Sequence, residues 1–361
     1  MRLNLYPKSI VALLALLLAA TAAKAQIQPK TAPSSPPATQ HPILLDVVVT
    51  DRAGNPIPGL KQSDFTVLDD KHPQAITSFR EAVGVGPGAD PPVQAMVLVD
   101  GYNNTYHRLE LLRVQVVKYL RQNSELPLPM SLDLITYKSQ SQTEPTRNGN
   151  AVAESLDSAK LGLDPIHTMD EWVAFQKNIA ELIKKEVSLP GRKLLVLLGP
   201  GWPHEMGRDE RLQAERNKFL FENIIWMSTM LRQARITLYS VDFREAVDHS
   251  TNYQQFLKGA TSPQDFSLGN LTLKVLAVQS GGEVLNQSNN VDESISRCLR
   301  DARVYYTLTF QPEPGSPPGK YHDLQVRVDK PGLIVRTRTG YYSGPDSEED
   351  GLAPFHNFSL R

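Results

Sequence analysis

The sequence predicts an α/β protein. Its main part is a doubly wound, mostly parallel sheet over residues 92–303, and a small β-sandwich-like module is built from the segments on either side. Between residues 93 and 303, short apolar runs typical of strands buried on both faces alternate with longer stretches of helical periodicity. That alternation indicates a parallel sheet covered by helices. Before and after it, short strands separated by turns indicate antiparallel sheets.

The chain ahead of the sheet begins with a leader. Residues 1–25 have a basic start, an apolar run and an Ala-Lys-Ala exit, which is the pattern of a secretory signal peptide. Residues 26–42 are rich in Pro, Ser, Thr and Ala, and predict a flexible linker. An N-terminal β segment follows at residues 43–82, with strands expected at 43–50, 65–68 and 75–79.

The elements of the central sheet follow from apolar runs and from helical spacing. Buried strands are expected at residues 95–99, 131–137, 193–198, 236–241 and 284–285. Helices are expected at residues 106–122, 169–187, 209–233, 271–279 and 291–302. A C-terminal β segment at 304–343 contains strands at 304–310, 324–328 and 333–337, followed by an acidic tail at 344–361 that is expected to be disordered. Because neither β segment alone has enough strands to bury a core, the two are predicted to form one module.

Composition excludes several classes of function. Lys and Arg total 38 against 39 Asp and Glu, and this balance argues against nucleic-acid binding. Cys298 is the only cysteine, so no disulfide can form within the chain and a Cys-rich zinc site is excluded. No segment after the leader is long and apolar enough to span a membrane. The mature chain is therefore expected to begin near Gln26 and to be secreted or periplasmic.

Four stretches of the sequence carry a family resemblance. They are VTDRAGNPIPGL at residues 49–60, VLVD at 97–100, QSGGE at 279–283 followed by DARVYY at 301–306, and PGLIVR at 331–336 followed by GYY at 340–342. In this order they resemble the von Willebrand factor A-related proteins of acidobacteria. The resemblance implies a von Willebrand A domain whose binding site lies at the carboxyl ends of the strands, as is general for open α/β sheets.

The family often holds a divalent cation with an Asp-x-Ser-x-Ser loop, a Thr and a second Asp. Here the resemblance places Asp100 at the start of that loop, Tyr102 and Asn104 at the two serine positions, Thr168 at the Thr, and Pro200 at the second Asp. Asp100, Asn104 and Thr168 would be the ligands of a Mg²⁺ ion, which prefers oxygen. Because Tyr102 and Pro200 offer no short oxygen ligand, the metal site is expected to be degenerate and the protein to have no cofactor.

Aromatic and histidine side chains are expected around the same loops. Tyr102, Tyr106 and Trp202 either supply contact area for a partner or pack together over the lost metal site, and both interpretations stay open. The predicted function is non-catalytic binding or adhesion, with a protein or peptide partner outside the cytoplasm. The predicted binding residues are Asp100, Tyr102, Asn104, Tyr106, Thr168, Trp202 and His204.

Two alternatives belong to other classes of function. A secreted hydrolase would use Asp100 with the loop histidines His107, His167 and His204, although the sequence has neither a Gly-x-Ser-x-Gly elbow nor a phosphate-binding loop. An envelope-assembly protein would need no discrete site. Non-catalytic binding is preferred because no residue pattern assigns a catalytic group.

Overall fold

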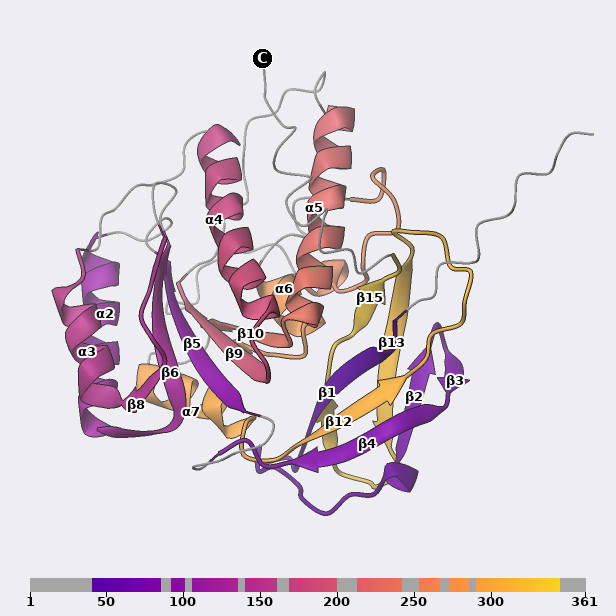
Figure 1. Cartoon of the computed structure of the whole chain (residues 1–361), viewed down its shortest axis with the longest axis horizontal. Coiled ribbons are helices and arrows are strands. Elements are labelled where there is room, and N and C mark those ends of the chain that lie inside the picture. Colours follow the sequence, from indigo (N-terminus) through magenta and orange to yellow (C-terminus); the bar gives the residue numbers. More distant parts are fainter. Residues whose placement is uncertain are drawn as a thin grey trace, which may run out of the picture. The chain divides into compact units, whose positions relative to one another are not determined.

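The computed structural model describes residues 41–85, 92–100, 106–135, 140–160, 169–199, 213–241, 253–266, 273–285 and 290–344 (Figure 1). The predicted leader, most of the first linker and nearly all of the acidic tail lie outside the described residues. Residues from Gln40 onward belong to one compact unit.

The central sheet has seven strands, with the order β11-β10-β9-β5-β6-β7 and with β8 also paired to β6. The strands are β5 (Val93–Asp100), β6 (Glu125–Ile135), β7 (Gln140–Gln142), β8 (Thr146–Asn148), β9 (Arg192–Leu198), β10 (Ile236–Val241) and β11 (Val284–Leu285). Five of them, β11, β10, β9, β5 and β6, run parallel, whereas β7 and β8 are antiparallel to β6. The α/β class with a mostly parallel sheet is therefore confirmed.

Helices cover both faces of this sheet. They are α2 (Tyr106–Gln122), α3 (Gly149–Ser158), α4 (Met169–Val187), α5 (Gln213–Gln233), α6 (Leu273–Gln279) and α7 (Val291–Arg300), with a short 3-10 turn η3 (Tyr253–Phe256) before α6. On β5, Met96 and Leu98 belong to an apolar cluster with α4, α5 and α6, while Val97 and Val99 belong to a second cluster with α2, α3 and α7. Since alternate residues of a strand point to opposite faces, the sheet is doubly wound.

The β module consists of two four-stranded antiparallel sheets, β14-β1-β12-β4 and β15-β13-β2-β3. Its strands are β1 (Ile43–Thr50), β2 (Phe65–Asp69), β3 (His72–Gln74), β4 (Ile76–Ala82), β12 (Tyr305–Phe310), β13 (Tyr321–Val328), β14 (Ile334–Arg336) and β15 (Gly340–Tyr342), with the 3-10 turn η1 (Gln62–Asp64) before β2. Leu45 of β1 lies opposite Leu308 of β12, and both belong to a third apolar cluster shared by the two sheets. Each sheet combines strands from both ends of the chain, as the sequence predicts.

Several short elements escape the sequence patterns. The elements β3, β7, β8, α3 and β15 were not expected, and β6 begins at Glu125 rather than at residue 131. Pro127 and Pro129 interrupt the apolar pattern at the start of β6. They precede Met130, the first β6 residue paired with β5, so the missing proline N–H groups do not break that ladder.

Two side chains of particular chemistry lie in the apolar cores of the central sheet. Trp226 on α5 is 8% exposed and packs in the cluster with α4 and α6. Cys298 on α7 is fully buried, and burial raises the pKa of its thiol, which makes it a packing residue rather than a nucleophile. Within the described ranges, no helix is long and apolar enough to cross a membrane.

Candidate functional site

The strand order creates a switch point at the carboxyl edge of the sheet. From β5 the chain passes through α2 to β6 on one side, and it later returns to β9 on the other side of β5. Ligands of open α/β sheets bind in the crevice where the strand order reverses in this way. In this chain the switch point lies between the carboxyl ends of β5, at Asp100, and of β9, at Leu198.

The structure describes only part of the predicted binding site. Asp100 is the last residue of β5, where its backbone lies opposite Ile135 of β6. Tyr106 opens α2 and is 62% exposed at the same edge. The side chain of Asp100 lies outside the described residues, as do Tyr102, Asn104, Thr168, Trp202 and His204. The degenerate cation site therefore remains a prediction, based on the types of residue at its ligand positions.

The motif around Asp301 forms a buried polar junction between the β module and the central sheet. Arg336 donates from Nη1 and Nη2 to the two Asp301 carboxylate oxygens at 2.7 and 2.6 Å. The Tyr239 hydroxyl donates to Asp301 Oδ2 at 2.5 Å, and Arg192 Nη1 donates to the Asp301 carbonyl at 2.8 Å. Burial lowers the pKa of Arg336, but the hydrogen bonds and the charge of Asp301 outweigh it, so the net shift is upward. Asp301 therefore fixes β14 through a charge-assisted, bidentate pair.

The Gln-Ser-Gly-Gly-Glu motif completes this junction. A Cβ at Gly282 would lie 1.9 Å from the Leu238 carbonyl oxygen, so this close approach of two backbones requires glycine. Glu283 accepts bonds from Arg297 at 2.8 and 3.1 Å and lies 3.4 Å from Arg336 Nε. A groove of about 500 Å³ runs past these residues, and its charged lining residues are Glu283, Arg297, Arg336 and Arg338.

The tyrosine pair of the third motif also has structural contacts. Tyr306 donates from its hydroxyl to the Ile57 carbonyl at 2.6 Å and accepts from the Leu60 N–H at 3.1 Å. The guanidinium of Arg192 lies 4.7 Å from the centre of the Tyr305 ring. These contacts hold the first motif and the central sheet against β12. The motifs that carry the family resemblance thus serve largely to join the two sheet systems, a role that the sequence interpretation missed.

A second polar cluster lies inside the β module. His322 Nδ1 is 3.0 Å from Asp69 Oδ1 and 3.5 Å from Asp70 Oδ2, a grouping with the residue types of a metal site. The Tyr341 hydroxyl already donates to Asp69 Oδ2 at 2.9 Å, and the Lys320 ammonium lies 2.9 Å from Asp70 Oδ2. A cation would have to displace both groups. The arrangement fits a set of side-chain hydrogen bonds that links β2, β13 and β15.

Comparisons with known proteins place the chain among low-identity structural neighbours. No family model matches it, and no curated protein matches it. It is similar to an aerotolerance-related membrane protein from Bacteroides fragilis, with 11% identity and a TM-score of 0.34, over 58% of this chain and 98% of that one.

Two further structures are similar at the same level. The von Willebrand factor type A protein from Catenulispora acidiphila has 11% identity and a TM-score of 0.32, over 84% of this chain and 74% of that one. The manganese-loaded TRAP protein of Plasmodium vivax has 12% identity and a TM-score of 0.33, over 72% and 96%. Likeness at this level carries no argument about function, so the strand order defines the class: a doubly wound α/β sheet with a switch point between β5 and β9.

Proposed function

We propose that this chain is a non-catalytic binding module that acts outside the cytoplasm and takes a protein or peptide partner at the carboxyl edge of its central sheet. One observation carries the proposal: the strand order puts the switch point between β5 and β9, where these strands end at Asp100 and Leu198. Such a switch point is where an open α/β sheet generally binds its ligand.

The exposed side chains of α2 support a partner of apolar character. Tyr106 is 62% exposed in the first turn of α2, and Leu111 and Val114 are 51% and 61% exposed further along the same helix. Exposed aromatic side chains such as Tyr106 are typical anchors of protein interfaces. In this proposal Tyr102 and Trp202 add contact area from the two loops, Asp100 orients the first loop, and no metal or cofactor is needed.

A retention experiment tests the proposal. The chain lacking residues 1–25 is immobilised and exposed to an envelope extract, in parallel with Tyr106→Ala, Trp202→Ala and Leu189→Ala. Leu189 is 41% exposed in the connection between α4 and β9, at the opposite edge of the sheet, and serves as a matched control. A partner retained by the parent chain and by Leu189→Ala, but lost by both aromatic variants, is the expected result.

Two outcomes count against this function. Equal retention by all four proteins would place the partner elsewhere on the molecule. Hydrolytic turnover that disappears in His204→Ala and Asp100→Ala, while both variants unfold at the same denaturant concentration as the parent, would favour the hydrolase alternative.

A further inference from the structure

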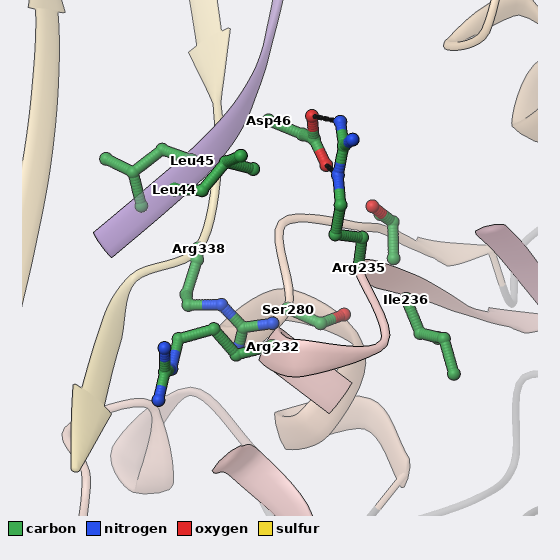
Figure 2. A pocket seen from close by; sticks show the side chains of 9 residues that line it. Leu44, Leu45, Asp46, Arg232, Arg235, Ile236, Ser280 and Arg338 are labelled. Atoms are coloured by element: carbon green, nitrogen blue, oxygen red, sulfur yellow. Dashed lines mark hydrogen bonds and ion pairs between the residues drawn. The ribbon is translucent and has the colours of Figure 1, made fainter. Parts of the chain in front are cut away.

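A small pocket between the β module and the central sheet contains three arginines. We call it the arginine pocket; it is lined by Leu44, Leu45, Asp46, Arg232, Arg235, Ile236, Thr237, Ser280 and Arg338 (Figure 2). Its volume is about 20 Å³. A cavity of this size holds a single water-sized particle.

The one carboxylate of the arginine pocket is already engaged. Arg235 approaches Asp46 through Nη2 to Oδ1 at 2.6 Å and through Nε to Oδ2 at 3.3 Å. Thr307 also donates to Asp46 Oδ1, at 3.4 Å. Figure 2 shows this pair on one side of the pocket, with the side chains of Arg338 and Arg232 on the other.

Arg338 is buried without an acidic partner. It is 8% exposed, and its hydrogen bond runs from Nη1 to the backbone carbonyl of Ser228 at a long 3.4 Å. Among the described residues, no Asp or Glu forms an ion pair with it. A guanidinium has five N–H donors, and a buried charge is costly unless it is paired.

The electrostatic environment of Arg338 shows the same imbalance. Burial, followed by the charge of Arg232, lowers the pKa of Arg338 to about 9, although Asp46 opposes the shift. The two hydroxyl groups in the pocket are hydrogen-bonded to groups other than Arg338. Thr237 Oγ1 accepts from Arg192. Ser280 Oγ donates to the Ala277 carbonyl and accepts from the Leu238 N–H.

We propose that the arginine pocket is a binding site for a single-atom anion, with chloride as its ligand, held by the N–H groups of Arg338 on the side where Arg232 lies. The charge follows from the guanidinium of Arg338, which forms no ion pair among the described residues, while the carboxylate of Asp46 in the same pocket is bound to Arg235. The assignment to a single atom follows from the small volume of the pocket, about 20 Å³. The bound anion would tie the segment after β14 to α5, since Arg338 lies on the first and Arg232 on the second.

Bromide provides a direct test, because it resembles chloride and scatters X-rays anomalously. Crystals of the full chain grown in sodium bromide are expected to show an anomalous peak within hydrogen-bond distance of the Arg338 guanidinium. No peak there, or bromide only at exposed positions, would overturn the proposal. An oxyanion in the pocket, grown from sulfate or phosphate, that bromide does not replace would overturn the assignment of a single-atom anion.

Thermal unfolding provides a second readout in solution. At constant ionic strength, replacing gluconate by chloride is expected to raise the melting temperature of the parent chain by about 2–4 °C. The substitution Arg338→Gln is expected to abolish this rise. Arg327→Gln, which alters an exposed arginine on β13, should keep it. A chloride-dependent rise of equal size in the parent and in Arg338→Gln would refute the site, and the bromide crystals decide the matter if that variant fails to fold.

Discussion

Two arginines that are two residues apart show how differently this fold treats a buried positive charge. Arg336 lies in the junction, with two short hydrogen bonds to Asp301 and with Glu283 at 3.4 Å. Arg338 lies in the arginine pocket, with one long bond to a backbone carbonyl. Both join the β module to the central sheet.

The difference shows that burial alone does not decide what a charge contributes. A buried charge with a matched partner fixes geometry, and its loss is expensive because the partner is left unpaired. A buried charge without a partner lowers stability until a counterion or a proton change compensates it. The junction thus determines how the two sheet systems dock, whereas the arginine pocket makes that docking responsive to anions.

The largest effect is expected when the strand that supports both regions is removed. β14 pairs with β1 through Val48 opposite Arg336, and β1 also pairs with β12. Deleting residues 26–80 removes β1, β2, β3 and most of β4, so β12 loses both neighbours. We expect amide-exchange protection in Tyr305–Phe310 to be lost, as measured by hydrogen exchange. Unchanged protection there would show that the C-terminal strands fold without the N-terminal segment.

Breaking the junction at its carboxylate should give the next largest effect. Asp301→Asn removes the charge that holds the partly buried Arg336 while the residue 301 side chain stays buried, and such a break typically costs about 3–5 kcal/mol. Urea unfolding measures the loss. The same substitution at Asp157, which forms an exposed pair with Arg121 at 2.9 Å, should change the free energy of unfolding by less than about 1 kcal/mol. Similar losses in the two variants would mean that the junction contributes little to stability.

Much of the fold is predictable because its longer elements have strong periodicity. The helix Tyr106–Gln122 and the strand Ile43–Thr50 have the bounds that the apolar spacing indicates. The strand β3 contains Pro73 and has no buried residue, so nothing in its sequence marks it as a strand. The helix α3 is short and depends on a cap, in which Asn148 accepts from the Ala151 N–H.

The two candidate sites differ in whether the sequence predicts their location. The carboxyl edge at Asp100 is predictable, because the alternation of strands and helices already implies where a parallel sheet binds ligands. The arginine pocket is not, because Asp46, Arg232 and Arg338 lie far apart in the sequence. The pairing of β1 with β14 brings Asp46 near Arg338, and Arg232 comes from α5. No local pattern around any of these residues indicates such a meeting.

Asp133 is the acidic counterpart of Arg338, and its effect should depend on pH. It is fully buried on β6, accepts from Ser131 at 3.2 Å, and has no partner for Oδ1 among the described residues. Burial raises the pKa of Asp133 to about 7 from 3.8, and the nearby Glu186 adds to the shift. The folded state therefore binds this proton more tightly than the unfolded chain, so stability falls as pH rises between these two values and is lowest above the folded-state pKa.

Asp133→Asn should remove that loss. At about 1.4 kcal/mol per pKa unit, the variant is expected to gain stability on the order of 4 kcal/mol near pH 8 and little near pH 4, relative to the parent. Urea unfolding at the two pH values measures the difference, with Asp157→Asn as the exposed control. A variant that is equally destabilised at both pH values would show that the ionised carboxylate costs nothing in the fold.

The smallest effect on stability is expected from adding a divalent cation, whose predicted site is the carboxyl edge. This ion is opposite in charge to the anion proposed for the arginine pocket. The metal-binding pattern of the family that the sequence resembles would place Mg²⁺ beside Asp100, but Pro200 has no side-chain oxygen and Tyr102 occupies a position where that pattern has a serine. A Mg²⁺ site needs near-octahedral oxygen geometry and loses water reluctantly, so these replacements should weaken binding sharply. We therefore expect magnesium gluconate, which leaves chloride constant, to leave the melting temperature nearly unchanged against EDTA.

A positive result would be easy to recognise. A cation at about a hundredfold excess over its Kd would stabilise the folded chain by about 2.7 kcal/mol, which is a shift of several degrees. If Mg²⁺ or Mn²⁺ produces that shift and Asp100→Ala abolishes it, the carboxyl edge holds a working metal site. The binding module would then recognise its partner through a metal ion, because Mg²⁺ keeps coordination positions that a partner carboxylate can fill. If the shift persists in Asp100→Ala, the cation binds elsewhere, and Asp69, Asp70 and His322 are the residues to substitute next.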